Sequence, residues 1–318
     1  MTTAVDTAPA ATAPSSPLPT GLVERLAALV TAADGRPRQQ SFSPFDGALV
    51  GEVPTCDAQD VEEAVRRART AQRAWAQRPL ADRAAVLRRY HDLLLARQAQ
   101  VLDVTQVETG KARVNAFEEL ADAAMTARYY ANTAAKHLKP TRRQGAVPGL
   151  TKAVEHHHPK GVIGVISPWN YPLTLAVSDA LPALVAGNAV VLKPDAQTPF
   201  TALIAIELLY VAGLPRELFQ VVTGAGRVLG TPMIEQVDYL MFTGSTQTGR
   251  LIAEQCGRRL IGFSAELGGK NPMLVLADCD LDKTVEGAAR ACFSNSGQLC
   301  ISVERMYVED AVYDRFVP

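Results

Sequence analysis

The sequence predicts an α/β protein built around a doubly wound parallel sheet. Short, mostly apolar runs alternate with segments of helical character from residue 161 onward. Strands that alternate with helices are typical of parallel sheets with right-handed crossovers. The apolar character is continuous rather than alternating, which indicates strands that are buried on both faces. These runs are GVIGVIS (161–167), AVVLK (189–193), FQVVT (219–223) and YLMFT (239–243).

The chain before this sheet is expected to be helical from residue 58 to about residue 136. Apolar residues recur there at spacings of three and four, which is the repeat of one helix face. We expect a first helix over 58–77, a second from about Ala81 to Val104, and a third over 116–138. The apolar stripe of the first helix consists of Val61, Val65, Ala68, Ala71 and Trp75.

Short extended stretches on both sides of a turn predict a β-hairpin arm between the helices and the sheet. His156, His157 and His158 lie near the end of this arm. Adjacent residues of a strand point to opposite faces, so three consecutive histidines do not converge on one ion. We therefore predict no metal site there.

The alternation of helices and strands continues beyond residue 243. We expect a helix that begins in GSTQTG (244–249), strands near GFSAEL and PMLVLA, and a helix from about Asp282 to Ser294. A strand at ERMYVED follows. The chain closes on VYDRFVP, which has the character of a helix interior and carries no capping glycine.

The composition excludes several classes of function. The 318 residues include 32 Lys and Arg against 33 Asp and Glu, a balance that argues against nucleic acid or an anionic membrane as partner. No run approaches the roughly 18 apolar residues of a membrane-spanning helix. Residues 1–20 contain no Lys or Arg, so they do not form a secretory signal and are expected to be a disordered tail. The five cysteines lack C-x-x-C spacing, which suits reduced thiols in a cytoplasmic protein.

Ligands of such a sheet bind at the carboxyl ends of its strands, so the loops after the strands form the candidate site. The loop GSTQTG is expected to open a helix, whose free backbone N–H groups favour a phosphate. The dinucleotide fingerprint G-x-G-x-x-G is absent in its required form, because 224–230 has one residue too many before the last glycine. Arg250 and Leu251 exclude a Walker-type phosphate loop.

Three residues near these loops form a plausible chemical set. Cys300 lies in a polar turn after a predicted helix, Glu266 lies in SAELGGKNP, and Asn170 lies in ISPWNYP. A thiol nucleophile, a carboxylate base and an amide donor suffice for acyl transfer through a thioester. Any one cysteine is also a candidate for a small buried side chain, so residue type alone does not select Cys300.

Five motifs follow one another along the chain: ISPWNYP, AGNAVVLKPDAQTP, FTGSTQTG, AELGGKNP and FSNSGQLC. Their order and separations resemble those of the aldehyde dehydrogenase superfamily, and the match runs from about residue 40 to the end of the chain. The last two are most similar to bacterial NADP-dependent succinate-semialdehyde dehydrogenases. The resemblance implies a Rossmann-like cofactor-binding domain over 21–141 and 160–267, and an oligomerisation arm over 142–159. It also implies the N-terminal part of an α/β catalytic domain over 268–318, so we expect a C-terminally truncated family member.

The resemblance also implies roles for individual residues. Cys300 stands at the position of the nucleophile, Asn170 with the backbone N–H of Cys300 at the oxyanion site, and Glu266 at the base that activates water. Relatives that prefer NAD often carry a glutamate where this chain has Ala196. A carboxylate there would repel a 2′-phosphate, so we predict NADP rather than NAD. The implied cofactor contacts are Trp169, Asn170, Lys193, Pro194, Asp195, Ala196, Gly244, Ser245 and Leu267.

The implied reaction oxidises an aldehyde to a carboxylic acid, most similarly succinate semialdehyde to succinate. Arginine is the natural partner of the substrate carboxylate. Two positions where some relatives carry arginine are Ser178 and Ser294 in this chain, and Arg305 lies near in sequence. Another aliphatic aldehyde or semialdehyde is therefore an alternative substrate, and an inactive cofactor-binding fragment is an alternative function. The resemblance implies a homo-oligomer for the full-length family member.

Overall fold

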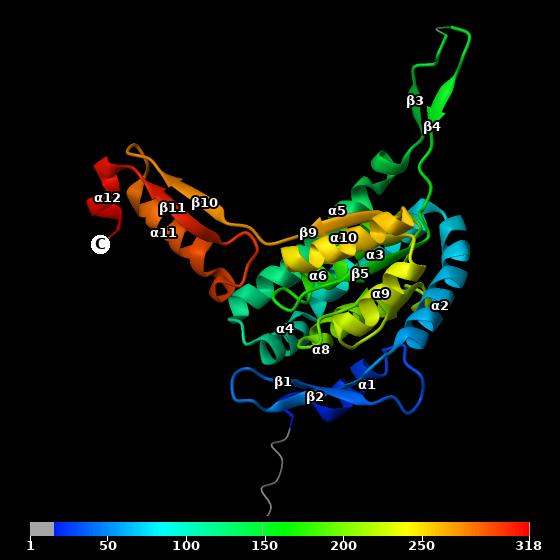
Figure 1. Cartoon of the computed structure of the whole chain (residues 1–318), viewed down its shortest axis with the longest axis horizontal. Helices are drawn as coiled ribbons and strands as arrows, with labels where there is room; N and C mark the ends of the chain where they lie inside the picture. Colours follow the sequence, from blue (N-terminus) through cyan, green and yellow to red (C-terminus); the bar gives the residue numbers. More distant parts are fainter. Residues whose placement is uncertain (1–15, 148, 318) are drawn as a thin grey trace, which may run out of the picture.

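The chain folds around a five-stranded sheet, with a hairpin arm and a C-terminal unit that stand out from it (Figure 1). The computed structural model describes residues 16–147 and 149–317. The strand order is β7-β6-β5-β8-β9, and all neighbouring strands are parallel. The predicted doubly wound parallel sheet is therefore confirmed. Its strands are β5 (Val162–Ile166), β6 (Ala189–Lys193), β7 (Phe219–Val221), β8 (Tyr239–Thr243) and β9 (Gly262–Glu266).

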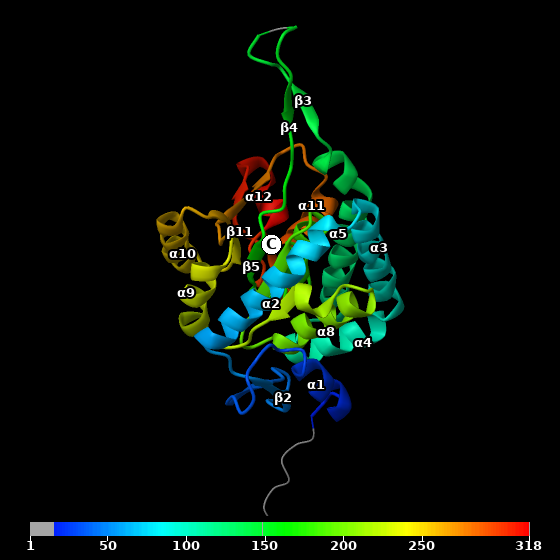
Figure 2. The ribbon, with the colours of Figure 1, turned by 90° about the vertical axis from the view of Figure 1, so that its right-hand side faces the viewer.

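The order of the strands reverses at β5, the central strand. The chain adds β6 and β7 on one side of β5 and then returns to add β8 and β9 on the other side. Helices α7 (Ala180–Val185) and α8 (Pro199–Val211) cover one face of the sheet. Helices α9 (Gly226–Gln236) and α10 (Thr246–Arg259) cover the opposite face (Figure 2). The carboxyl ends of β5 and β8 thus form the switch point at which open α/β sheets bind ligands.

Helix α2 (Ala58–Gln77) begins with a capping box and buries the predicted stripe. The Asp57 carboxylate accepts from two backbone N–H groups of the first turn, and the Asp60 carboxylate accepts from the N–H of Asp57. Trp75 is 2% exposed, and its Nε1 donates to the carbonyl oxygen of Leu184 at 2.7 Å. Val61, Val65 and Ala68 are buried as predicted, whereas Ala71 is half-buried.

Two helices, α3 (Leu80–Ala96) and α4 (Gln98–Thr109), stand where the sequence predicted one from about Ala81 to Val104. That prediction is wrong because Arg97 leaves helical geometry, with φ −103° and ψ 16°. The turn lets the buried face of α4 pack against α8 and α5 (Arg113–Leu138). Neither glycine nor proline marks the turn, so the apolar pattern alone did not reveal it.

The N-terminal segment is packed from residue 16 onward. Ser16 Oγ donates to the carbonyl oxygen of Val50 at 2.6 Å, and Leu18 is buried beside helix α1 (Thr20–Ala27). The predicted disordered tail is therefore wrong for residues 16–20, because Leu18 joins the hydrophobic core. Residues 1–15 of that predicted tail lie outside the described residues. Strands β1 (Arg38–Phe42) and β2 (Leu49–Pro54) follow as an antiparallel pair.

The predicted hairpin arm is present between α5 and β5. Strands β3 (Thr141–Arg143) and β4 (Ala153–Glu155) are antiparallel, and the arm projects away from the sheet (Figure 1). Arg143 Nε contacts Glu155 Oε2 at 2.6 Å across the two strands. The arm is thus held by its own pairing and offers its surface to solvent.

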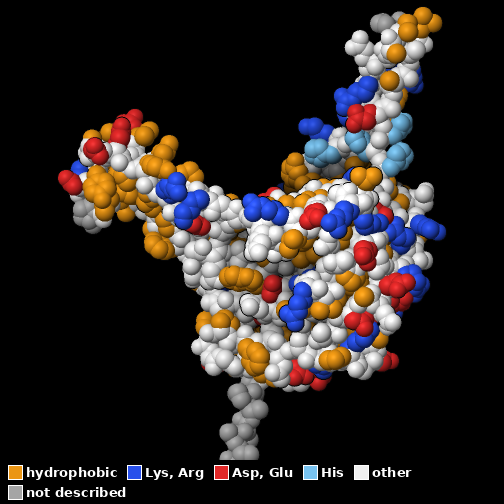
Figure 3. All heavy atoms as spheres, viewed as in Figure 1, with side chains coloured by type: hydrophobic (Ala, Val, Ile, Leu, Met, Phe, Trp, Pro, Cys, Tyr) orange, Lys and Arg blue, Asp and Glu red, His pale blue; other side chains and the backbone are white. Residues whose placement is uncertain are grey.

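The C-terminal unit is a small parallel β-α-β arrangement beside the main sheet. Strands β10 (Asn271–Val275) and β11 (Val303–Val308) pair in parallel, with helix α11 (Leu281–Phe293) between them. Hydrophobic side chains gather on its surface (Figure 3). Leu274, Phe293 and Ile301 of this unit are 67%, 75% and 71% exposed. The remaining elements are α6 (Thr174–Val177), η1 (Arg216–Leu218), η2 (Ser294–Gly297) and α12 (Asp310–Phe316). Within the part of the chain that the structure describes, no helix is long and apolar enough to span a bilayer.

Candidate active site

Three strand ends bring predicted site residues to one edge of the sheet. Trp169 and Asn170 follow β5, Gly244 and Ser245 follow β8, and Glu266 is the last residue of β9. The N–H of Gly244 donates to the Glu266 carbonyl oxygen at 3.0 Å, which joins two of these ends directly. Because β5 and β8 are neighbours, the candidate site lies at the switch point of the sheet.

A cavity of about 230 Å³ lies between this edge of the sheet and the loop that follows η2. Cys300 is exposed and lines this cavity together with Asn170 and Glu266, although the three residues come from distant parts of the sequence. Four further predicted residues line it as well: Trp169, Gly244, Ser245 and Leu267. The structure thus brings the whole predicted catalytic set into one cavity. Lining residues that the sequence analysis did not identify include Leu175, Thr243, Gln298 and Leu299.

The loop after β8 is shaped for close approach of another group. Ser245 caps helix α10, because its Oγ accepts from the N–H of Thr248 at 3.2 Å. A Cβ atom on Gly244 would lie 2.6 Å from Cζ of Phe242, and one on Gly249 would lie 2.6 Å from Cδ2 of Leu267. A side chain at either position would have to displace Phe242 or Leu267, and backbone N–H groups at the start of a helix are suited to bind a phosphate.

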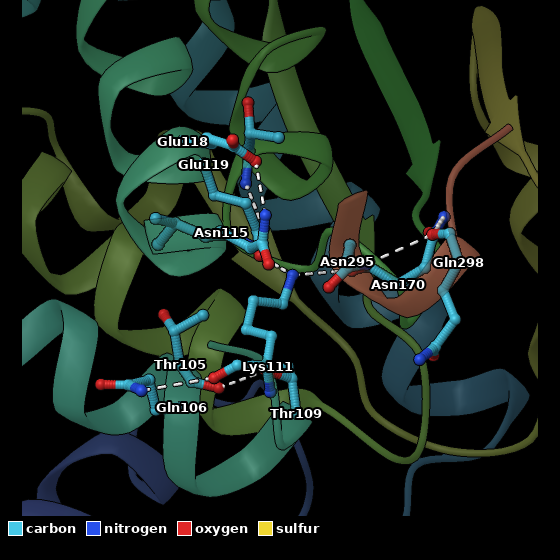
Figure 4. A network of polar contacts seen from close by, with 12 residues as sticks. Thr105, Gln106, Thr109, Lys111, Asn115, Glu118, Glu119, Asn170, Asn295 and Gln298 are labelled. Atoms are coloured by element: carbon cyan, nitrogen blue, oxygen red, sulfur yellow. Dashed lines mark hydrogen bonds and ion pairs between the residues drawn. The ribbon is translucent and has the colours of Figure 1, made fainter. Parts of the chain in front are cut away.

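Asn170 is held through both its side chain and its backbone (Figure 4). Its Nδ2 donates to the carbonyl oxygen of Gln298 at 2.9 Å. Its own carbonyl oxygen accepts from Nζ of Lys111 at 2.8 Å and from Nδ2 of Asn295 at 3.0 Å. An amide Nδ2 carries two hydrogens, so the bond to Gln298 leaves one for a ligand in the cavity.

A buried ion pair lies behind Asn170, and the sequence analysis did not identify it. Lys111 contacts Glu119, and the two side chains are 2% and 0% exposed. Burial lowers the pKa of Lys111 and raises the pKa of Glu119, because neither charge is solvated by water; each partner opposes these shifts. The available signal was a glutamate on the apolar face of α5, between Ala116 and Ala123.

A larger cavity of about 570 Å³ adjoins the first and shares Trp169, Asn170 and Gln298 with it. Ala196 lines this second cavity. Lys193, by contrast, is 5% exposed and lines neither cavity. Pro194 and Asp195 line neither cavity either. Burial lowers the pKa of Lys193, while the charge of Asp195 acts in the opposite direction. A cofactor contact at Lys193, Pro194 or Asp195 therefore stays a prediction.

Within residues 16–147 and 149–317, no arginine lines either of these two cavities. Arg305 lies on β11, where its Nη1 donates to the hydroxyl oxygen of Tyr307 at 3.0 Å. Ser294, at one position where some relatives carry arginine, donates to the carbonyl oxygen of Arg290 at 2.7 Å. The cavity with Cys300 thus has no arginine to pair with a substrate carboxylate.

Comparison with known proteins identifies the family. Residues 30–318 match the aldehyde dehydrogenase family. The chain belongs to the aldehyde dehydrogenase family. The resemblance that the five motifs indicated is therefore confirmed, and the fold, with its five-stranded parallel sheet, is that of an aldehyde dehydrogenase.

Individual relatives of this aldehyde dehydrogenase chain carry more specific names. A protein of Mycolicibacterium smegmatis, provisionally named an NADP(+) succinate-semialdehyde dehydrogenase, is 58% identical over 294 residues, which are 92% of this chain and 57% of that protein. The NADP(+) succinate-semialdehyde dehydrogenase of Escherichia coli K12 is 38% identical over 279 residues, 86% of this chain and 57% of the other. The crystal structure of succinate-semialdehyde dehydrogenase from Burkholderia pseudomallei gives a TM-score of 0.86 at 34% identity and covers 90% of this chain and 59% of that one. The chain thus spans little more than half the length of these relatives.

Proposed function

We propose that this chain carries the active site of an NADP-dependent aldehyde dehydrogenase that converts succinate semialdehyde to succinate. The main support is the cavity that collects Cys300, Asn170 and Glu266 from three separate segments. The names of the Mycolicibacterium and Escherichia relatives supply the support for this substrate and cofactor. Aldehyde-dependent formation of NADPH by the purified chain tests the proposal, and its loss in Cys300→Ser assigns the reaction to this cavity.

In the proposed reaction the Cys300 thiolate attacks the aldehyde carbon, so a C–S bond forms and the carbonyl oxygen becomes an oxyanion. The second hydrogen of Asn170 Nδ2 and the backbone N–H of Cys300 donate to this oxyanion. The nicotinamide, when bound, supplies the acceptor for the hydride that leaves the same carbon. Glu266 then takes a proton from water, which attacks the resulting thioester and releases the acid and the Cys300 thiolate.

The residues around the first cavity fit a dinucleotide. Glycines at 244 and 249 let the loop and the first turn of α10 pack closely on Phe242 and Leu267, and Ser245 adds a hydroxyl at the start of the helix. These groups would hold the pyrophosphate. Ala196 brings no carboxylate to the loop that follows Lys193, so a 2′-phosphate would meet no repulsion from that position. The backbone of this loop, from Lys193 through Pro194 to Asp195, would hold the phosphorylated ribose of NADP, while the Asp195 carboxylate accepts from the N–H of Gln197 at 3.0 Å.

The substrate assignment has its own test, because no arginine lines the described cavities. Butanal has the same chain length as succinate semialdehyde and lacks its carboxylate. If a cationic group beyond the lining of these two cavities pairs with the carboxylate, kcat/KM for succinate semialdehyde should exceed that for butanal by at least about tenfold, or ~1.4 kcal/mol. Equal values would favour the alternative, a dehydrogenase for uncharged aliphatic aldehydes.

Cofactor binding without turnover is a second candidate function. The exposed apolar side chains of the C-terminal unit, Leu274, Phe293 and Ile301, favour it, because soluble proteins rarely leave such a surface uncovered. Calorimetric titration with NADP separates the two candidates. Binding of NADP without aldehyde-dependent NADPH formation supports the second candidate, and formation of NADPH refutes it.

The arm and the cysteines extend the proposal to assembly and compartment. The arm ends in exposed apolar residues, Val147 and Leu150, which are 47% and 86% exposed. We expect it to pair with a second copy of the chain, as an exposed strand pair with an apolar tip readily does. Sedimentation of wild type and of Leu150→Asp checks this, since a homo-oligomer should dissociate in the variant. All five cysteines are free, which suits a cytoplasmic enzyme.

A further inference from the structure

The buried ion pair behind the site is attached to one short stretch of backbone. Nζ of Lys111 donates to Glu119 Oε1 and to the carbonyl oxygen of Asn170, the latter at 2.8 Å. The other carboxylate oxygen, Glu119 Oε2, accepts from the N–H groups of Leu173 and Thr174 at 2.8 and 3.3 Å. In the described part of the chain, the hydrogen bonds of the two side chains thus end on each other and on the turn that begins at Asn170 (Figure 4).

These contacts fix geometry more than they add stability. Taking two charges out of water cancels much of their mutual attraction, so a buried ion pair is weak evidence for stabilisation. Its bonds are directional, however, and they hold both ends of the turn, at Asn170 and at Thr174. The ammonium of Lys111 also lies 4.3 Å from the centroid of the Tyr171 ring, which limits movement of the residue next to Asn170.

Asn295 connects the same turn to the loop that carries Cys300. It is 4% exposed and has a φ of 51°, in the left-handed region that asparagine tolerates better than most residues. Its Nδ2 donates to the carbonyl oxygens of Asn170 and Gln298, at 3.0 and 3.3 Å. Gln298 O also accepts from Asn170 Nδ2 at 2.9 Å, two residues before Cys300.

We propose that Lys111, Glu119 and Asn295 are positioning residues that set the distance and orientation between the Asn170 amide and the Cys300 thiol. The carbonyl oxygen of Asn170 is the common point: it accepts from Lys111, which lies between α4 and α5, and from Asn295 in η2, just before the loop that carries Cys300. Oxyanion stabilisation requires this alignment, because a misplacement of about 1 Å can lower a rate by ~10²-fold. The inference rests on the proposed function, since it assumes that Cys300 and Asn170 act on one carbonyl group.

Two reactions of Cys300 distinguish a variant that disturbs the positioning of the site from one that disturbs the fold as a whole. p-Nitrophenyl acetate acylates the thiolate: the new C–S bond forms through an oxyanion, and p-nitrophenolate leaves with the electron pair. Iodoacetamide alkylates the same thiolate by direct displacement of iodide, so no carbonyl oxygen acquires charge. A positioning residue therefore affects acylation and not alkylation. The rate ratio of the two reactions, measured on the 318-residue chain, is the readout, and Cys300→Ser identifies the signal of Cys300.

The variants are Lys111→Met and Asn295→Gly, each with a matched control. Lys111→Met removes the buried ammonium, and Lys283→Met removes an ammonium that pairs with Asp280 on the surface, where Lys283 is 84% exposed. Asn295→Gly keeps the backbone conformation and removes the amide that donates to both carbonyl oxygens. Its control is Ser296→Gly, at an exposed neighbour that also has a positive φ, of 59°.

We expect the ratio of acylation to alkylation to fall at least about tenfold in Lys111→Met and Asn295→Gly, and to stay within about twofold of wild type in both controls. Equal ratios in all four variants would overturn the positioning role and leave the proposed function intact. If Lys111→Met does not fold, the ratio of acylation to alkylation in Asn295→Gly tests the positioning role by itself. A burst of p-nitrophenolate that persists in Cys300→Ser would contradict the proposed function and this inference together.

Discussion

Replacing Asn170 by alanine should lower the acylation rate of Cys300 with little loss of stability. The side chain gives up the bond from Nδ2 to the carbonyl oxygen of Gln298, at 2.9 Å, and the donor to the oxyanion. The carbonyl oxygen of residue 170 stays in place, so the bonds from Lys111 and Asn295 persist. The variant therefore removes a chemical group while the surrounding network remains.

The two effects differ in size. Gln298 O keeps a donor in Asn295 Nδ2, at 3.3 Å, so the free energy of unfolding should fall by only about 1 kcal/mol, the net value of one hydrogen bond. Loss of an oxyanion donor, by contrast, lowers rates by roughly 10²–10³-fold, or about 2.7–4 kcal/mol. The expected loss in acylation rate is therefore larger, in free energy, than the expected loss in stability, so the chemical role of Asn170 can be told apart from its structural role.

Burst kinetics with p-nitrophenyl acetate and calorimetric unfolding measure the two effects on the same samples. Asn170→Asp is a second variant, which keeps the size of the side chain, removes the N–H groups and adds a carboxylate that repels the carbonyl oxygen of Gln298. Both variants should acylate at least about a hundredfold more slowly than wild type. An acylation rate within about threefold of wild type in either variant would refute the role of Asn170.

Three further predictions concern the cofactor, the base and a buried carboxyl. Ala196→Glu should lower the ratio of kcat/KM for NADP over NAD by at least about tenfold, because a carboxylate repels the 2′-phosphate; an unchanged ratio would place the phosphate elsewhere. Glu266→Gln should leave acylation of Cys300 intact and slow hydrolysis of the acyl group by about 10²–10⁴-fold, whereas rapid hydrolysis would exclude Glu266 as the base. Burial raises the pKa of Glu108 to about 7 from 4.5, so between these values the unfolded chain binds fewer protons and the free energy of unfolding should fall as pH rises. Urea unfolding across this range should show a flatter profile in Glu108→Gln, and identical profiles would contradict the raised pKa.

The sheet could be predicted from the sequence because its signals are local. The strands β5 and β6 are buried at every position, and their continuous apolar runs report this directly. The break between α3 and α4 at Arg97 left no such signal, since ordinary helix-forming residues flank it and tertiary packing sets the turn. The local sequence pattern thus predicts which helices and strands form, but it does not predict where each helix ends.

The site was only partly visible in the sequence. Asn170, Glu266 and Cys300 stood out through motifs and a family resemblance, and the structure places them in one cavity. Lys111 and Glu119 could not be assigned, because their contacts to the turn after Asn170 span 59 and 54 residues. Such contacts depend on how α4, α5 and the sheet pack, and that packing has no counterpart in residue spacing.

The most direct test of the proposed active site is a single-turnover experiment with succinate semialdehyde and NADP, followed by mass spectrometry of the quenched protein. We expect NADPH to form once per chain in the initial burst and a succinyl thioester to appear on Cys300 alone among the five cysteines. Cys300→Ser should form neither product. NADPH formation that persists in Cys300→Ser, or a thioester on another cysteine, would contradict the assignment of Cys300 as the nucleophile.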